Sequence, residues 1–403
     1  MVAFIARYLG VDDFGKLAYI QSFVGLFMAL ATLGMDGLVV KALVTNSSAF
    51  RAILATAFTL RLAGAVSMIS AIALVSVIIL KDELYHLIFI ASLTSLFQAF
   101  FVFDYYFQAH VMGRISAKIK FVGLLISLLL KVFVIYLDAG LSVLVYIMVI
   151  ESAVIGILMY LCFLNLRTGF SFRAFDWGIG TNLLMKGWPL ILSGFVMAIY
   201  MKIDQSMLNW MLQSSDVGIY AAAVKVADGI NFLPVIICSS LFPWVLQVQS
   251  SQDLFKDRLI AIHSLMIWLA LVVISAFSIG GDFVIAALFG DEFSESANVL
   301  TIYTWASLIV YVNVSSTLWI ISQDMQKYKV LMDIGGAILN ILLNLYLIPT
   351  YGPIGAAIAT VVSYTLTFAL AYTIIKPFRK NLRYVLSAII SPQKILRIGS
   401  RYE

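Results

Sequence analysis

Long apolar segments constrain this chain more than any other feature of its sequence. A membrane-crossing helix needs about 20 predominantly apolar residues. Continuous apolar runs of this kind differ from the short alternating strands of a transmembrane β-barrel. We therefore predict an all-α polytopic membrane protein of about twelve transmembrane helices. Their expected positions are residues 1–9, 16–40, 51–80, 84–109, 117–137, 141–165, 187–212, 217–243, 257–280, 296–321, 329–348 and 353–375.

The composition agrees with that class. Hydrophobic residues make up 62% of the 403 residues and charged residues only 12%, whereas soluble domains are about half apolar and a quarter charged. The first segment, residues 1–9, covers only about half a bilayer and has no basic leader of the kind that precedes a secretory signal. We expect a misplaced start or a fragment there, with a half-helix packed against its neighbours as the alternative.

The basic residues predict an orientation. The formal net charge is +5, and most Lys and Arg residues fall in alternate loops, on the side that also holds the C-terminus. Cytoplasmic loops of membrane proteins carry such an excess. We therefore predict a multi-pass membrane protein with a cytoplasmic C-terminus, and we interpret the charge as a topology signal instead of a nucleic-acid footprint.

The loops are too short for a soluble catalytic domain. Cys162 and Cys238 fall in predicted helices, where they are expected to be small apolar side chains. No two of His86, His110 and His263 have the spacing of a metal site. The sequence also lacks the Gly-rich Lys-Ser/Thr loop of ATP-driven engines. We predict a protein that is not an enzyme and that needs no cofactor or metal.

The two halves of the chain echo each other. The sequence DDFGKLA at 12–18 parallels SDVGIYA at 215–221, and a repeat of six helices keeps both halves in the same orientation. We predict two six-helix lobes related by a parallel pseudo-two-fold axis around a central cavity. Their predicted ranges are 1–165 and 187–376, joined by a cytoplasmic linker at 166–186 and followed by a basic tail at 377–403 that lies on the membrane surface or is unstructured.

Four charged residues lie well inside two of the predicted helices: Lys202, Asp204, Lys225 and Asp228. A charge at membrane depth costs about 2.5–3.5 kcal/mol on insertion scales, and chains tolerate it mainly where it pairs or lines a cavity. At a rise of about 1.5 Å per residue along the two helices, all four residues lie at a similar depth in the membrane. The pattern indicates a transporter with a polar pathway, and it leaves open ion pairs that only lock two helices together.

Other charges fall inside the first half. Lys131 and Glu151 are expected to form a similar pair, and Arg61 is a further candidate in a long segment. Three carboxylates near predicted cytoplasmic helix ends are interpreted as solvated: Asp36, Asp104 and Asp333.

Three stretches carry a resemblance to a known family. ARYLGVDDFGKLAYIQSF at 6–23 resembles the first outer loop of bacterial polysaccharide flippases, which belong to the multidrug/oligosaccharidyl-lipid/polysaccharide (MOP) exporter superfamily. The sequence at 202–245 looks like that family's seventh and eighth helices. LIPTYGPIGAAIATVVSY at 347–364 resembles its hairpin of helices eleven and twelve. The similarity covers nearly the whole chain.

The resemblance implies an O-antigen-type flippase with a cavity that opens alternately to each side. Its substrate would be an oligosaccharide repeat linked to undecaprenyl pyrophosphate, moved across a bacterial inner membrane and used for surface polysaccharide or lipopolysaccharide. Cavity cations, namely Lys202, Lys225, Arg61 and Lys131, would neutralise the diphosphate. Pairing carboxylates, namely Asp204, Asp228 and Glu151, would couple transport to an ion gradient. Expected partners are the lipid-linked oligosaccharide, membrane lipids and polysaccharide polymerase or chain-length machinery, with no nucleic acid.

Three other functions remain open. A drug or metabolite antiporter of the same superfamily would share the fold. A membrane-embedded polysaccharide polymerase or ligase is disfavoured by the short outer loops. A non-transporting scaffold of an export complex is the third alternative.

Overall fold

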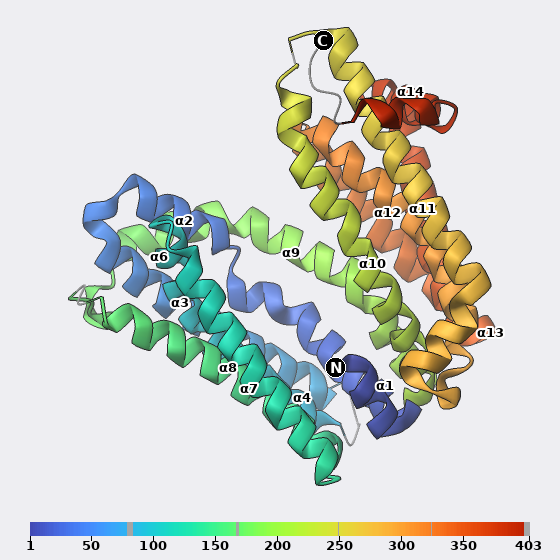
Figure 1. Cartoon of the computed structure of the whole chain (residues 1–403). Coiled ribbons are helices and arrows are strands. Elements are labelled where there is room, and N and C mark those ends of the chain that lie inside the picture. The colour runs from blue at the N-terminus through green and yellow to red at the C-terminus, as the bar shows by residue number, and fades with distance from the viewer. Residues whose placement is uncertain (79–83, 167–168, 249, 324, 399–403) are drawn as a thin grey trace. The chain divides into compact units, whose positions relative to one another are not determined.

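Figure 1 shows a computed structural model of the chain, which describes residues 1–78, 84–166, 169–248, 250–323 and 325–398. Within those ranges the chain forms helices joined by turns, with no strand. Ten helical stretches among the described residues are long and apolar enough to cross a membrane, which confirms the all-α polytopic class. The end of the predicted segment 51–80, residues 167–168 of the predicted linker and residues 399–403 of the predicted tail lie outside the described ranges.

Short connections separate the helices, so the order of elements follows the predicted segments closely. In the first half of the chain the helices are α1 (Val2–Thr32), α2 (Asp36–Thr45), α3 (Phe50–Ile78), α4 (Tyr85–Ser92), α5 (Thr94–Gln98), α6 (Val102–Ala109), α7 (Gly113–Tyr136) and α8 (Gly140–Leu164). In the second half they are α9 (Trp177–Met211), α10 (Ser214–Leu246), α11 (Gln252–Phe289), α12 (Ser296–Ser322), α13 (Gln326–Ile374) and α14 (Phe378–Ile389).

Two glycines break α1 and α13 at the boundaries that the sequence predicts between adjacent segments. Gly10 has φ 71° and Gly352 has φ 58°, and only glycine adopts such angles without a Cβ penalty. Beyond Gly352 the chain folds back on itself, because a Cβ added to Gly355 would lie 2.0 Å from the carbonyl oxygen of Leu347. Each broken stretch therefore corresponds to two of the predicted segments.

The chain divides into two compact units. The first comprises Met1–Leu9 and Lys16–Ser206, and the second comprises Gly10–Gly15 and Met207–Glu403. Most of α9 therefore belongs to the first unit. This division differs in position from the lobes predicted at 1–165 and 187–376, which remain a prediction about the sequence repeat.

In the first unit, the predicted segment 16–40 is two helices instead of one. Leu33 and Gly34 have φ angles of 51° and 61°, which end α1 before α2 begins. Helices α3 and α9 pack closely against this break at two glycines, Gly64 and Gly187. A Cβ on Gly64 of α3 would lie 2.5 Å from a carbonyl oxygen of α1, and one on Gly187 of α9 would lie 2.7 Å from the carbonyl oxygen of Leu33. The break is thus enclosed by backbone contacts that larger residues would prevent.

In the second unit, the two echoing sequence motifs contact each other. A Cβ on Gly15 would lie 1.7 Å from the carbonyl oxygen of Ser214, and a Cβ on Gly218 would lie 2.1 Å from that of Val11. The contact is reciprocal, because residues 11 and 214 and residues 15 and 218 are separated by the same 203 positions. The repeat suggested by the sequence therefore has a direct counterpart in a backbone contact.

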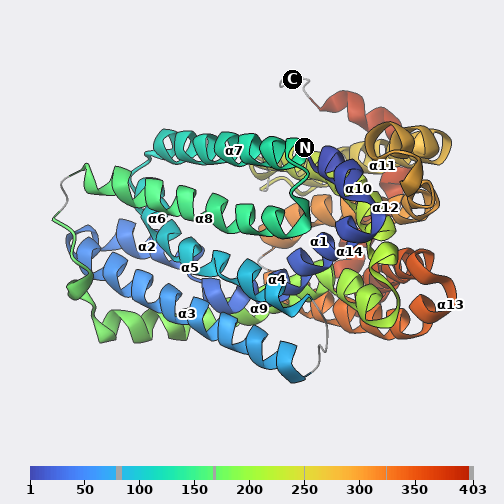
Figure 2. The ribbon, with the colours of Figure 1, turned by 90° about the horizontal axis from the view of Figure 1, so that it is seen from below.

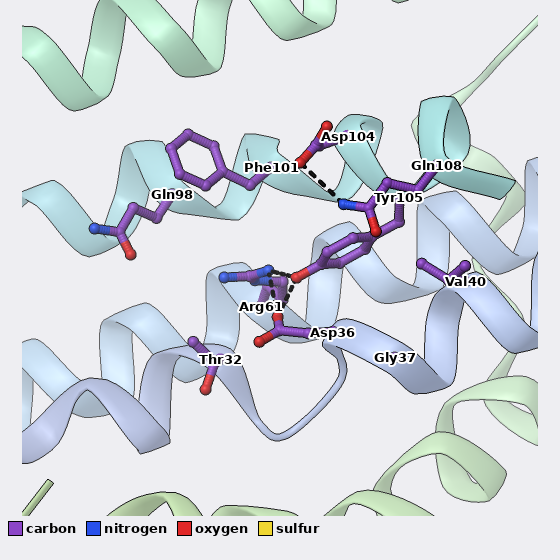
Figure 3. A pocket seen from close by; sticks show the side chains of 10 residues that line it. All are labelled: Thr32, Asp36, Gly37, Val40, Arg61, Gln98, Phe101, Asp104, Tyr105 and Gln108. Atoms are coloured by element: carbon purple, nitrogen blue, oxygen red, sulfur yellow. Dashed lines mark hydrogen bonds and ion pairs between the residues drawn. The ribbon is translucent and has the colours of Figure 1, made fainter. Parts of the chain in front are cut away.

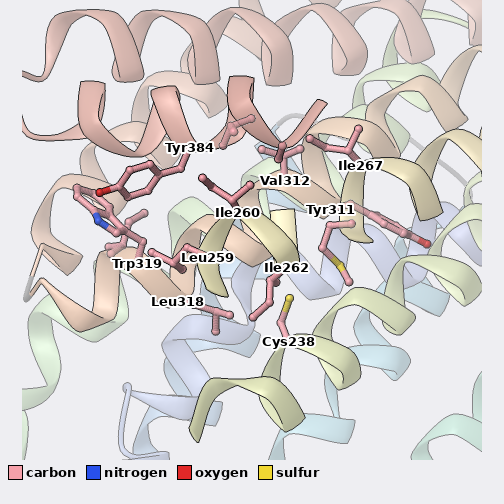
Figure 4. Packing of buried hydrophobic residues seen from close by; sticks show 14 of the residues in the cluster. Cys238, Leu259, Ile260, Ile262, Ile267, Tyr311, Val312, Leu318, Trp319 and Tyr384 are labelled. Atoms are coloured by element: carbon pink, nitrogen blue, oxygen red, sulfur yellow. The ribbon is translucent and has the colours of Figure 1, made fainter. Parts of the chain in front are cut away.

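The core of the second unit gathers apolar side chains from α10 to α14 (Figure 4). Met266 of α11, Tyr311 and Trp319 of α12 and Tyr372 of α13 are each buried there. Cys238 of α10 joins them as a small apolar side chain, as expected.

After α13 the described part of the tail forms α14 over Phe378–Ile389 and a short 3-10 helix over Pro392–Arg397. Phe378, Tyr384 and Val385 pack into the core of the second unit. Arg379 and Arg383 lie on the exposed side of α14. Placement of this helix on a membrane surface stays a prediction.

A buried hydrogen-bond network also holds α14. The His263 Nδ1 of α11 lies 2.7 Å from the Ser315 hydroxyl, and its Nε2 lies 3.1 Å from the amide oxygen of Asn381. The Asn381 amide nitrogen donates to the Ser316 hydroxyl at 3.0 Å. His263 is therefore a structural residue of three packed helices, and it has no metal-binding neighbours among the described residues.

Replacing Asn381 with Leu should destabilise the protein, because it leaves a buried histidine nitrogen without a partner. A buried group in that state costs about 1–3 kcal/mol. We expect a lower midpoint of thermal unfolding for purified Asn381→Leu than for Gln393→Leu, which changes an exposed polar residue of the same tail. Equal midpoints for the two variants would contradict a stabilising role for the network.

Candidate functional site

The break between α1 and α2 opens on a cavity of about 510 Å³ (Figure 3). Its polar residues come from α1, α2, α3, α5 and α6, which surround the break. The lining residues are Thr32, Asp36, Gly37, Val40, Arg61, Gln98, Phe101, Asp104, Tyr105 and Gln108.

Arg61 is the central charge of this cavity. Its side chain is 4% exposed, and its Nη1 lies 3.4 Å from a carboxylate oxygen of Asp36. The same nitrogen donates to the Tyr105 hydroxyl, which in turn donates to Asp36 (Figure 3). The Asp36 side chain is 67% exposed. A buried cation is therefore matched with a carboxylate that solvent reaches.

Asp104 forms the second charged group of the cavity. Its Oδ2 accepts from Lys120 Nζ of α7 at 2.8 Å and from Gln108 Nε2 at 3.1 Å. Its other oxygen is buried without a hydrogen-bond partner, as is Nε of Arg61. The interpretation of Asp104 as a solvated helix-end residue is wrong, because tertiary packing buries it inside the stretch from α4 to α6.

Asp36 and Asp333, the other two carboxylates that the sequence suggested were solvated at helix ends, differ from each other in the structure. Asp36 does begin a helix, α2, and is exposed, but this helix starts at the break and its carboxylate binds Arg61. Asp333 pairs with Lys329 at 2.8 Å one turn away and is partly exposed, as a helix-end residue would be.

The charges of the Arg61 cavity suit an exchange of anions. Arg61 and Lys120 formally balance Asp36 and Asp104, but the two pairs differ in burial. The N-terminus of α2 adds partial positive charge beside Arg61. Because the Asp36 carboxylate is mostly in solvent, an incoming anion can take its place at the guanidinium without leaving a buried carboxylate unpaired.

The predicted pair of Lys131 and Glu151 is present in the first unit. Lys131 Nζ of α7 lies 3.0 Å from Glu151 Oε2 of α8, and the Ser127 hydroxyl donates to the same oxygen. The two helices lie side by side in both views of the chain (Figures 1 and 2). The lysine and glutamate side chains are 21% and 31% exposed. Neither residue lines the Arg61 cavity.

We expect Lys131→Gln and Glu151→Gln each to destabilise the protein, because either change leaves a half-buried charge without its partner. Each loss should be about 1 kcal/mol, since partial exposure weakens the pair. The double variant Lys131→Gln/Glu151→Gln should lose less than the two single variants together, because it leaves neither charge without its partner. Thermal unfolding of purified protein measures all four forms. Additive losses in the double variant would show that the two residues do not act as a pair.

The four charges that first suggested a transporter fall in different units. Lys202 and Asp204 are on α9 in the first unit, where the Lys202 side chain lies 3.8 Å from the Cβ that a residue at Gly25 would have. Asp204 is buried. Lys225 and Asp228 are on α10 in the second unit, three residues apart on one helix face. Pairing across the two helices, and the roles of all four in transport, stay predictions.

Curated relatives of this chain include two proteins of the archaeon Haloferax volcanii. The probable flippase AglR is 28% identical over 257 residues, which cover 61% of this chain and 52% of AglR. The probable low-salt glycan biosynthesis flippase Agl15 is 26% identical over 175 residues, which cover 42% of this chain and 37% of Agl15. The chain thus spans about half or less of the length of these relatives.

Solved structures with a similar fold include two transporters. The lipid II flippase MurJ in an inward closed conformation superposes with a TM-score of 0.66 and 13% identity, covering 100% of this chain and 93% of MurJ. An inward-facing multidrug resistance MATE family transporter of the MOP superfamily superposes with a TM-score of 0.65 and 13% sequence identity, covering 94% of this chain and 94% of the transporter. A family model described as polysaccharide biosynthesis protein matches residues 1–249. The chain therefore belongs to the polysaccharide biosynthesis protein family, with the fold of MOP superfamily transporters, as its sequence motifs predicted.

Proposed function

We propose that this protein is a flippase that moves a lipid-linked oligosaccharide across the membrane by alternating access. The observation that carries the proposal is the Arg61 cavity, a buried guanidinium beside a broken helix in a chain of the polysaccharide biosynthesis family. A phosphate-linked sugar is strongly hydrated, and its passage through a low-dielectric interior requires a counter-charge. Arginine matches phosphate geometry through two parallel N–H donors.

The finer identity of the substrate is part of the same proposal. A diphosphate carrier of the undecaprenyl type and a surface polysaccharide repeat such as O-antigen fit the need for cations at Arg61, Lys202, Lys225 and Lys131. The two Haloferax relatives carry the name flippase, which supports the activity and does not specify a carrier. The membrane is proposed to be a bacterial inner membrane, with the C-terminus in the cytoplasm and polymerase machinery as a partner.

Ion coupling is proposed through Asp204, Asp228 or Glu151. One charge moving down 100 mV releases about 2.3 kcal/mol, enough to bias a transport cycle. In the alternative, flipping is passive and product removal drives it. Among these carboxylates, Glu151 pairs with Lys131 and Asp204 is buried, whereas Asp228 is exposed on α10.

The test is a flipping assay with purified protein in liposomes that contain a fluorescent lipid-linked oligosaccharide. We expect flipping above the protein-free rate, and we expect Lys202→Gln and Lys225→Gln to slow it at least tenfold, with Arg at either position restoring it better than Gln. Lys118→Gln, at an exposed position of α7, is the matched control. Rates equal to those of empty liposomes would reject a flippase, as would transport of a cationic dye without any flipping.

An imposed proton or sodium gradient adds a second arm to this assay. If a carboxylate couples transport, the gradient should accelerate flipping, and Asn or Gln at that residue should remove the acceleration. Equal rates with and without both gradients would leave Asp204, Asp228 and Glu151 as packing residues and would leave the flippase proposal intact.

A further inference from the structure

A second cavity of about 620 Å³ lies in the first unit, where α2 ends and α9 begins. It shares no lining residue with the Arg61 cavity, and α2 separates the two. Asp36, Gly37 and Val40 of α2 face the Arg61 cavity, whereas Leu38 and Lys41 line the second one. Positions three and four apart on a helix share a face, which explains how one short helix serves both cavities. We name the second cavity the Lys41–Lys186 pocket.

The polar side of this pocket is cationic. Lys41 and Lys186 both line it, and neither lies in a salt bridge with any described residue. One carboxylate, Asp176, is also present, but its Oδ1 accepts from the backbone N–H of Ile179 at 2.8 Å and caps α9. A carboxylate in that position is held by the positive end of the helix. Within the described ranges, no carboxylate is therefore dedicated to either lysine. The remaining polar residues of the lining are Thr45, Asn46 and Asn182.

The other side of the pocket is apolar and consists of Leu38, Ala42, Ile53, Ile179 and Leu183. A free phosphate ion would make no favourable contact with these apolar side chains. An amphiphile with an anionic head and a hydrocarbon chain matches both sides of the pocket at once.

The position of the pocket along α9 places it near the membrane surface. Trp177, the first residue of α9, is 66% exposed, and tryptophan is enriched at the level of lipid head groups. The lining residues of α9 extend from there to Lys186, roughly 14 Å along the helix. That distance covers the head-group region and the first part of an acyl chain. Lys41 and Lys186 are also among the basic residues that the charge distribution along the sequence predicts to be cytoplasmic.

We propose that the Lys41–Lys186 pocket binds an acidic glycerophospholipid of the surrounding membrane. Its phosphate lies between the two ammonium groups, its ester oxygens accept hydrogen bonds from the side-chain amides of Asn46 and Asn182, and an acyl chain follows the apolar wall. Lysine suits this role because it binds phosphate as a point charge and needs no fixed geometry. The bound lipid would join α2 to α9 at the end of the unit, on the side of α2 opposite Arg61. The proposal does not depend on what the protein transports.

The experiment measures lipid binding to the purified, delipidated full chain by native mass spectrometry. The probes are dioleoylphosphatidylglycerol, dioleoylphosphatidylcholine and glycerol 3-phosphate. We expect one phosphatidylglycerol per chain to bind at least tenfold more tightly than phosphatidylcholine, and glycerol 3-phosphate not to compete at equal concentration. The double variant Lys41→Gln/Lys186→Gln should weaken the phosphatidylglycerol binding roughly thirtyfold, since each basic residue near a lipid surface contributes about fivefold and the two factors multiply.

Matched variants separate this pocket from general surface charge. Lys118→Gln/Lys256→Gln removes two exposed lysines that lie outside the pocket, and it should leave the preference for phosphatidylglycerol unchanged. Lys41→Arg/Lys186→Arg should also retain it. Should the glutamine variant fail to fold, Ala42→Phe tests the same site by filling the cavity, and it should remove the preference.

Four results would overturn the proposal. These are equal binding of the two phospholipids, equal weakening by the control pair, competition by glycerol 3-phosphate at the same concentration as the lipid, and retention of the preference in Ala42→Phe. Competition by glycerol 3-phosphate would identify a site for a soluble phosphate compound. Equal weakening by the control pair would show diffuse attraction between a basic protein and an acidic lipid.

Discussion

Gly218→Ala should prevent the protein from reaching a stable fold, even though it adds one methyl group. The added Cβ would lie 2.1 Å from the carbonyl oxygen of Val11, and the partner change Gly15→Ala would place one 1.7 Å from that of Ser214. Both contacts are with backbone, so no side chain can move aside. Overpacking of this kind costs about 1–3 kcal/mol, and more where the backbone must shift. The yield of monodisperse protein and its midpoint of thermal unfolding measure the effect.

Gly229 of α10 provides the control for this prediction. A Cβ at Gly229 meets nothing within 4 Å, and alanine is favoured over glycine in a helix by about 1 kcal/mol. Gly229→Ala should therefore be as stable as the natural protein or slightly more stable. If Gly15→Ala and Gly218→Ala match Gly229→Ala in yield and midpoint, the close contact of the two motifs is absent from the folded protein.

Arg61→Met should reduce flipping of a lipid-linked oligosaccharide by more than tenfold while it lowers stability only moderately. The moderate loss is expected because the Asp36 carboxylate is 67% exposed and remains solvated without Arg61. Loss of the hydrogen bonds from the guanidinium to Tyr105 and Asp36 should lower the free energy of unfolding by about 1.5–3 kcal/mol. The flipping assay and thermal unfolding, measured on the same preparation, separate the two effects.

Three variants sharpen the test of Arg61. Arg61→Lys keeps the positive charge and should retain part of the activity, whereas Tyr105→Phe keeps Arg61 and removes one hydroxyl, so it should have a smaller effect. Arg114→Gln changes an exposed arginine at the start of α7 and should leave flipping unchanged. Full activity in Arg61→Met would show that the cavity does not take part in transport.

The sequence was sufficient to predict the membrane class, two of the breaks between adjacent segments and one ion pair. Apolar runs of crossing length specify helices directly, because backbone polar groups in lipid must be satisfied within the segment. The Lys131–Glu151 pair followed from similar depth on two adjacent helices, and the structure places the two charges 3.0 Å apart. The predicted boundaries after residue 9 and after residue 348 coincide with Gly10 and Gly352, the two glycines at which the structure breaks α1 and α13.

The group around Arg61 could not be assembled from the sequence. It depends on the break at Leu33 and Gly34. This break lies inside residues 16–40, whose continuous hydropathy predicts a single segment. Local spacing also gives no information on the contact of Tyr105 with Arg61, which joins residues 44 positions apart. One signal was available: glycines on both sides of Met35-Asp36 make a continuous helix less favourable there. Burial of Asp104 depended on Lys120 and likewise required the packed structure.

The reciprocal contact of the two glycine motifs has an evolutionary consequence. A contact in which residue 15 meets 214 and residue 218 meets 11 uses the same patch twice, as two identical subunits do around a two-fold axis. It is the contact expected if an ancestral six-helix protein formed a homodimer through this patch before its gene was duplicated and fused. In the separate ancestor, one substitution would have changed both sides of the interface at once. In the single chain Gly15 and Gly218 are encoded separately, so a substitution at either one alone disturbs the contact.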